Sequence, residues 1–68
     1  MAKRYFTLIE RIDGRWTIQF GDFDKETVTQ ERADRLDAHD APKAKDLRVI
    51  SSGAAQADID AAVAKFNA

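Results

Sequence analysis

The sequence predicts a single small α+β domain with the element order strand, strand, helix, strand, helix. Its 68 residues are enough for one hydrophobic core and too few for two, so residues 1–68 are expected to form one domain. A strong hairpin signal, Asp13-Gly14, stands between two strand-like segments. Two segments with one apolar face at helical spacing follow, and a third strand-like segment separates them.

The first two elements are expected to be strands over residues 4–11 and 15–20, which are rich in aromatic and β-branched residues. A two-residue loop would pair Ile12 with Arg15 and divide the apolar side chains between both faces. A three-residue loop, with Gly14 in the left-handed region of a G1 bulge, pairs Arg11 with Arg15 instead. We expect this second register because one face of the hairpin must be buried. The buried face would then carry Phe6, Leu8, Trp16, Ile18 and Phe20.

A helix is expected next, from a cap at Asp22 or Asp24 to about His39, where Ala41-Pro42 prevents its continuation. The apolar stripe of this helix is narrow, which predicts a surface helix held by one seam. The stripe consists of Val28, Ala33 and Leu36.

The remaining elements are a third strand over 45–52 and a second helix over 54–67. The helix has one clean apolar face, made by Ala55, Ile59, Ala62, Val63 and Phe66. Both helices and the hairpin therefore have a single apolar side. This favours a two-layer domain, with a three-stranded antiparallel sheet of order 2-1-3 and both helices on one face.

The other sheet face would stay open to solvent, and we expect it to bind a partner. It would present an apolar centre with an arginine and polar rim, which is typical of protein interfaces. The expected binding residues are Tyr5, Thr7, Ile9, Arg11, Arg15, Thr17 and Gln19 of the hairpin, with Arg48 and Ile50 of the third strand.

The residues offer no recognisable catalytic or metal-binding set. The chain has no cysteine, which excludes disulfides, thiolate catalysis and cysteine-ligated zinc. His39 is the only histidine, and one imidazole with neighbouring carboxylates lacks the ligand count of a zinc site. The carboxylate pairs Asp34 with Asp37 and Asp58 with Asp60 are expected on solvated helix faces. We therefore expect no enzyme activity, no metal and no cofactor.

Charge is distributed unevenly along a chain whose net charge is −1. Residues 1–20 hold four basic side chains, including Lys3, against two acidic ones, whereas residues 22–40 hold seven acidic against three basic. This asymmetry predicts a polarised surface. The balance favours a host protein as partner over nucleic acid, and no membrane association is expected. The absence of cysteine indicates a reducing compartment such as the cytoplasm, while monomer and homodimer both stay open.

The segments RYFTLIERIDGRWTIQFGDFDKETV, KAKDLRVISSG and QADIDAAVAKFN resemble short proteins encoded by phages and prophages. The resemblance covers most of the chain and lies in its overall character, without a diagnostic motif. Such proteins include anti-CRISPR proteins, which are small, cysteine-poor and non-enzymatic. They bind a Cas protein or effector complex and block recognition of the target nucleic acid. The resemblance implies an inhibitor of this kind in the host cytoplasm.

The first third of the chain also resembles the HicB-type antitoxin domain. The matching residues are Tyr5-Phe6, Leu8-Ile9-Glu10, Asp13-Gly14, Trp16 and Phe20-Gly21-Asp22. After Phe23 a charged helix replaces the usual Pro-Gly turn and third strand. The resemblance implies an antitoxin as one alternative function. A small nucleic-acid-binding module that uses Arg11 and Arg15 is the other.

Overall fold

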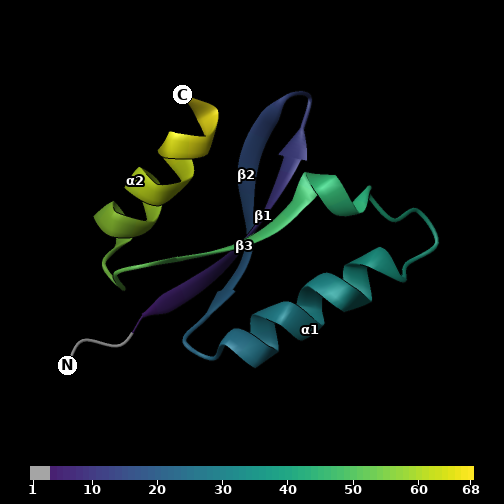
Figure 1. Cartoon of the computed structure of the whole chain (residues 1–68), viewed down its shortest axis with the longest axis horizontal. Coiled ribbons are helices and arrows are strands. Elements are labelled where there is room, and N and C mark those ends of the chain that lie inside the picture. The colour runs from purple at the N-terminus through teal and green to yellow at the C-terminus, as the bar shows by residue number, and fades with distance from the viewer. Residues whose placement is uncertain (1–3) are drawn as a thin grey trace.

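The computed structural model describes residues 4–68 and has the predicted order of elements (Figure 1). Lys3, which contributes to the charge asymmetry, lies outside the described residues. The sheet is antiparallel with strand order β2-β1-β3, so the predicted α+β class and strand order are confirmed. The elements are β1 (Tyr5–Ile12), β2 (Arg15–Asp22), α1 (Lys25–Leu36), the 3₁₀ turn η1 (Ala44–Asp46), β3 (Leu47–Ser52) and α2 (Gln56–Asn67).

The hairpin turns through a two-residue loop, so the predicted three-residue loop is wrong. Ile12 pairs with Arg15 across the loop. Asp13 and Gly14 both have positive φ angles, 52° and 79°. These angles match a type I′ turn, whose twist fits the right-handed twist of the two strands.

The bulge that was expected in the loop lies instead in the middle of β2. Ile9 of β1 pairs with Ile18. The preceding residue, Leu8, pairs with Phe20, so Gln19 is an extra residue in β2. Because the bulge shifts the alternation of β2, Ile18 shares a face with Ile9 and Phe20 shares the opposite face with Leu8. The apolar side chains of the hairpin are therefore divided between two faces.

Each face of the sheet has its own hydrophobic core, and the predicted arrangement with both helices on one face is wrong. The helices lie on opposite sides of the sheet (Figure 1). On the α1 face, the core consists of Leu8, Val28 and Leu47, with Phe6, Phe20, Leu36 and Val49 packed beside them. On the α2 face, it consists of Ile9, Ile50 and Val63, with Trp16 and Ala62 beside them.

The central strand explains this arrangement. Residues 5–9 of β1 form an almost unbroken run of apolar and β-branched side chains, which is typical of a strand covered on both faces. Leu8 and Ile9 are both fully buried although they point to opposite faces. A two-layer fold would leave one of these side chains in water, at a cost in hydrophobic free energy. The packing of α2 against the second face avoids this cost.

The first helix begins as predicted and ends earlier. Asp24 is its N-cap, and its carboxylate accepts hydrogen bonds from the Glu26 backbone N–H at 3.1 Å and the Thr27 hydroxyl at 3.0 Å. The helix ends at Leu36, and the backbone N–H of Asp37 closes the last turn. The predicted continuation to about His39 is therefore wrong.

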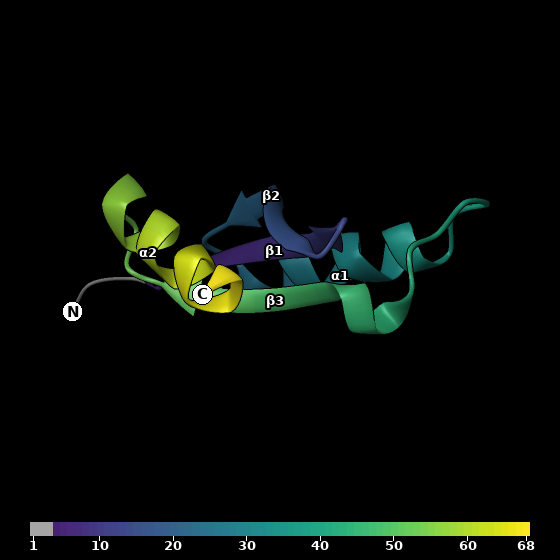
Figure 2. The same ribbon diagram turned by 90° about the horizontal axis from the view of Figure 1, so that it is seen from above.

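The molecule is a thin slab, with Cα extents of 39 × 27 × 14 Å. Figure 2 shows the strands stacked in the order β2, β1, β3 across the thin dimension, between the helices. Three strands at a spacing of about 4.8 Å span about 10 Å, which accounts for the thinness. Each broad side of the slab therefore has an edge strand at its centre, β2 on one side and β3 on the other.

Candidate protein-binding surface

The sheet face that was expected to be open is covered by α2. Thr7, Ile9 and Ile50 are 1%, 0% and 9% exposed, so these three side chains are not available to a partner without unfolding. Tyr5 is half-buried: its ring lies close to Gly21 and meets the ring of Phe23 edge-on, at 5.0 Å between centroids. Four of the expected binding residues therefore hold the fold together.

Three other expected residues do not lie together on that face: Arg15, Thr17 and Gln19. Arg15 and Thr17 pair with Ile12 and Glu10, which lie on the same face of β1 as Leu8. Both residues therefore lie on the α1 face. The Thr17 hydroxyl donates to the Glu10 carbonyl at 3.2 Å and accepts from the Gln19 amide at 2.8 Å. Only Arg15 is exposed, at the hairpin end of the sheet. The predicted nucleic-acid contacts of Arg11 and Arg15 would thus come from opposite faces.

The two remaining expected residues, Arg11 and Arg48, come together around aromatic rings. The Arg48 guanidinium lies 5.9 Å from the Trp16 ring centroid and 5.1 Å from that of Phe66. The Arg11 guanidinium lies 5.7 Å from the Trp16 ring, and the Trp16 and Phe66 rings meet edge-on at 6.0 Å. We call Arg11, Trp16, Arg48 and Phe66 the arginine–aromatic cluster. It joins β1, β2, β3 and the last turn of α2.

The two arginines of the cluster differ in their partners. Arg11 donates to the Asp46 carboxylate through Nη2 at 2.7 Å and through Nε at 3.0 Å. Among residues 4–68, no carboxylate forms an ion pair with Arg48. Arg48 is exposed, and its charge is therefore available for an external group while cation–π contacts hold its side chain.

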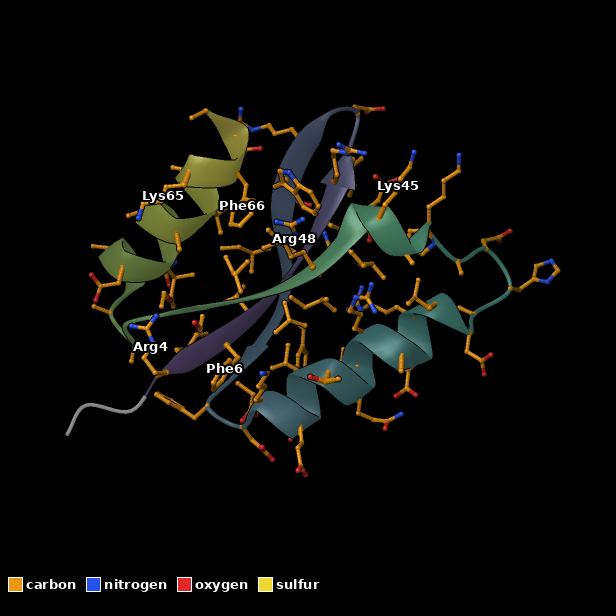
Figure 3. The ribbon with its side chains drawn as sticks, viewed as in Figure 1. Arg4, Phe6, Lys45, Arg48, Lys65 and Phe66 are labelled. Atoms are coloured by element: carbon orange, nitrogen blue, oxygen red, sulfur yellow. The ribbon has the colours of Figure 1, made fainter. Side chains whose placement is uncertain are left out.

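Further exposed cations lie along β3. Figure 3 shows Arg4 and Lys45 at opposite ends of the strand with Arg48 between them, and Phe66 of α2 beside Arg48. Arg4 donates to the Ser51 hydroxyl at 3.3 Å. Sequence reasoning assigned Phe66 to the core and left Arg4 and Lys45 out of the binding set. Nothing local in the sequence identifies them, because the docking of α2 and the pairing of β3 bring them together.

Negative charge gathers on α1, on the other face of the sheet. Asp24, Glu26, Glu31 and Asp34 line a shallow depression on the outer side of this helix. The predicted charge asymmetry thus becomes an acidic helix on one face and a row of cations along β3. His39 is exposed in the turn after α1.

Residues 4–68 contain no group of three or more histidine, aspartate or glutamate side chains placed to hold a metal ion. No helix in this part of the chain is long and apolar enough to cross a bilayer. No protein-family model, curated protein sequence or solved structure matches the chain.

Proposed function

We propose that the protein acts by binding another protein, without catalysis, through the arginine–aromatic cluster and the cations along β3. The observation that carries the proposal is Arg48, an exposed guanidinium held over two aromatic rings with no ion-pair partner among the described residues. The resemblance to small phage-encoded proteins makes a Cas protein or effector complex the first partner to test. The effect of binding would be to block target recognition.

Two physical arguments support this surface. Arginine and tryptophan are enriched among the residues that dominate the energy of protein interfaces. Immobilising a long side chain on binding costs about 0.5–1.5 kcal/mol, and this cost falls when the side chain is already held in place. Arg48 is held by Trp16 and Phe66 before any partner arrives. The surface is therefore prepared to bind an acidic group with little loss of entropy.

The test is complex formation with purified Cas effector complexes, followed on a sizing column and by target-DNA binding. We expect the wild-type protein to co-elute with an effector complex and to block its target binding. Arg48→Glu reverses the charge at the centre of the surface and should weaken the complex by at least about tenfold, or 1.4 kcal/mol. The matched control is Lys25→Glu, which makes the same charge change on exposed α1.

Two outcomes would contradict parts of the proposal. A complex that survives Arg48→Glu and is lost with Asp34→Lys would move the binding site to the acidic helix. Failure to bind any effector complex would remove the anti-CRISPR assignment. Capture of a toxin from a bacterial lysate, with the same loss in Arg48→Glu, would retain protein binding and favour the antitoxin alternative.

Nucleic-acid binding is the second candidate, because Trp16 and Phe66 place aromatic rings beside two arginines. Single-strand binders combine such rings with cations along a groove. Here both rings already make cation–π contacts with guanidinium groups, and the acidic helix repels a polyanion. A salt-sensitive shift of single-stranded DNA or RNA that is lost in Arg48→Glu would favour this candidate. We expect no shift at low salt.

A further inference from the structure

The two edge strands of the sheet differ in how their outward peptide groups are satisfied. In an antiparallel sheet, alternate residues of an edge strand point their N–H and C=O groups away from the neighbouring strand. Such groups are a template for pairing with another chain unless the protein blocks them. One edge of the sheet is interrupted at two places, and the other is regular and open over part of its length.

The edge of β2 is interrupted by a side chain and by the bulge. The Asn67 side chain at the end of α2 accepts from the Trp16 backbone N–H at 2.6 Å and donates to the Trp16 carbonyl at 3.0 Å. One side-chain amide thus occupies both the N–H and the C=O of Trp16, which a pairing strand would otherwise bond. Beyond it, the peptide groups of Ile18 also point outward, but the extra residue Gln19 follows at once and interrupts the regular spacing of outward groups.

The edge of β3 is blocked only at its first residue. Leu47 donates its backbone N–H to the Ala44 carbonyl, and its carbonyl accepts from Arg32 Nε at 3.2 Å. These bonds show that the backbone N–H and C=O of Leu47 point away from β1. Because this direction alternates along a strand, the peptide groups of Val49 and Ser51 point outward as well. No described residue outside the ladder bonds to the peptide groups of Val49 or Ser51. We call this open stretch the β3 edge.

The charges around the β3 edge indicate the chemistry of its occupant. Lys45 and Arg48 lie before it, and Arg4 contacts Ser51 at its far end. The carboxylates that flank it in the sequence lie beyond its two ends: Asp46 is paired with Arg11, and Asp58 packs against Gly53. Glu10 of β1 lies opposite Leu47, before the open stretch begins. A second copy of β3 would bring like charges together, which is destabilising across a strand pair.

We propose that the β3 edge accepts an extended acidic segment of a partner protein as a fourth strand. The inference rests on the proposed protein-binding function and adds how the partner is held. Hydrogen bonds from the peptide groups of Val49 and Ser51 supply the pairing, as in other cases of strand addition. Arg4, Lys45 and Arg48 select acidic side chains on the incoming strand.

The test uses a capped peptide in which glutamate alternates with valine, and the same peptide with lysine in place of glutamate. The acidic peptide should bind in a fluorescence-polarisation titration, and the lysine peptide should not. Amide exchange measured by NMR should be fast at Val49 and Ser51 in the free protein and slow in the complex. Lack of binding, or binding without protection of these two amides, overturns the proposal.

Ser51→Pro and Ser51→Ala separate the backbone from the side chain. Ser51→Pro removes an outward N–H, which an edge strand tolerates, together with the hydroxyl that Arg4 contacts, and should weaken peptide binding at least about tenfold. Ser51→Ala removes the same hydroxyl but keeps the N–H, and it should change binding by less than about twofold. Amide protection in the wild-type complex decides the matter if the proline variant does not fold. An effector complex lost in Arg48→Glu but unchanged in Ser51→Pro would retain protein binding and refute strand addition.

Discussion

Thr7 shows how a side chain that was expected to contact a partner can be a structural residue instead. It is 1% exposed between the central strand and α2, and its hydroxyl has no hydrogen-bond partner among the described residues. A buried hydroxyl without a partner costs about 1–3 kcal/mol. The methyl group of the threonine side chain fills space in the core, and the hydroxyl contributes no bond.

Thr7→Val should therefore leave the free energy of unfolding unchanged or raise it by about 1 kcal/mol, because valine keeps the shape and removes the polar atom. The measurement is urea unfolding followed by circular dichroism. Thr17→Val is the matched control: it removes a hydroxyl that bonds Glu10 and Gln19, and it should lower stability by about 1 kcal/mol. A clear loss of stability in Thr7→Val would show that its hydroxyl is bonded.

At the scale of elements, α2 both covers a sheet face and closes a strand edge. Val63 and Ala62 pack on the α2 face, and Asn67 at the end of the same helix bonds the outer backbone of Trp16. The sequence of the helix predicts the first role through its apolar spacing. The second role depends on where the helix ends relative to β2, which no local pattern indicates.

Asn67→Ala should open the β2 edge at Trp16. We expect amide exchange at Trp16 to accelerate, stability to fall by about 1–2 kcal/mol and self-association to increase with concentration. Exchange is followed by NMR and association by light scattering. Asn67→Asp can still accept from the N–H but cannot donate to the carbonyl, so its effect should be intermediate. Unchanged exchange at Trp16 would mean that the Asn67 amide does not protect it.

At the scale of the whole molecule, β1 couples the two cores. Leu8 faces the core under α1, and Ile9 faces the core under α2. Loss of either helix exposes a central strand that has no alternative cover. We therefore expect the sheet and the two helices to unfold together, in a two-state transition.

Val28→Ala tests this coupling because Trp16 reports from the opposite face of the sheet. The substitution deletes fully buried methyl groups under α1 and should lower stability by about 2 kcal/mol. The unfolding curves from Trp16 fluorescence and from helical circular dichroism should shift together to lower denaturant. A shift in the dichroism curve alone would mean that the two faces unfold separately.

Much of the fold could be predicted from local features of the sequence. Asp24 is a cap because its short carboxylate reaches the free N–H groups of the first helical turn. Asp13 and Gly14 form the turn because both tolerate positive φ. The element types and the strand order 2-1-3 follow from hydrophobic periodicity and from the crossover between β2 and β3. The candidate site was predicted only at Arg11 and Arg48.

The sequence alone therefore determined which segments become strands and helices, where the chain turns, and that its charges are separated along its length. The tertiary structure decided the position of the bulge at Gln19, the face that α2 covers, and the gathering of Arg48 with Trp16 and Phe66. Hairpin loop length and bulge position compensate one another, and both faces of β1 are apolar. Only the packing of two separate helices against the whole sheet distinguishes the alternatives.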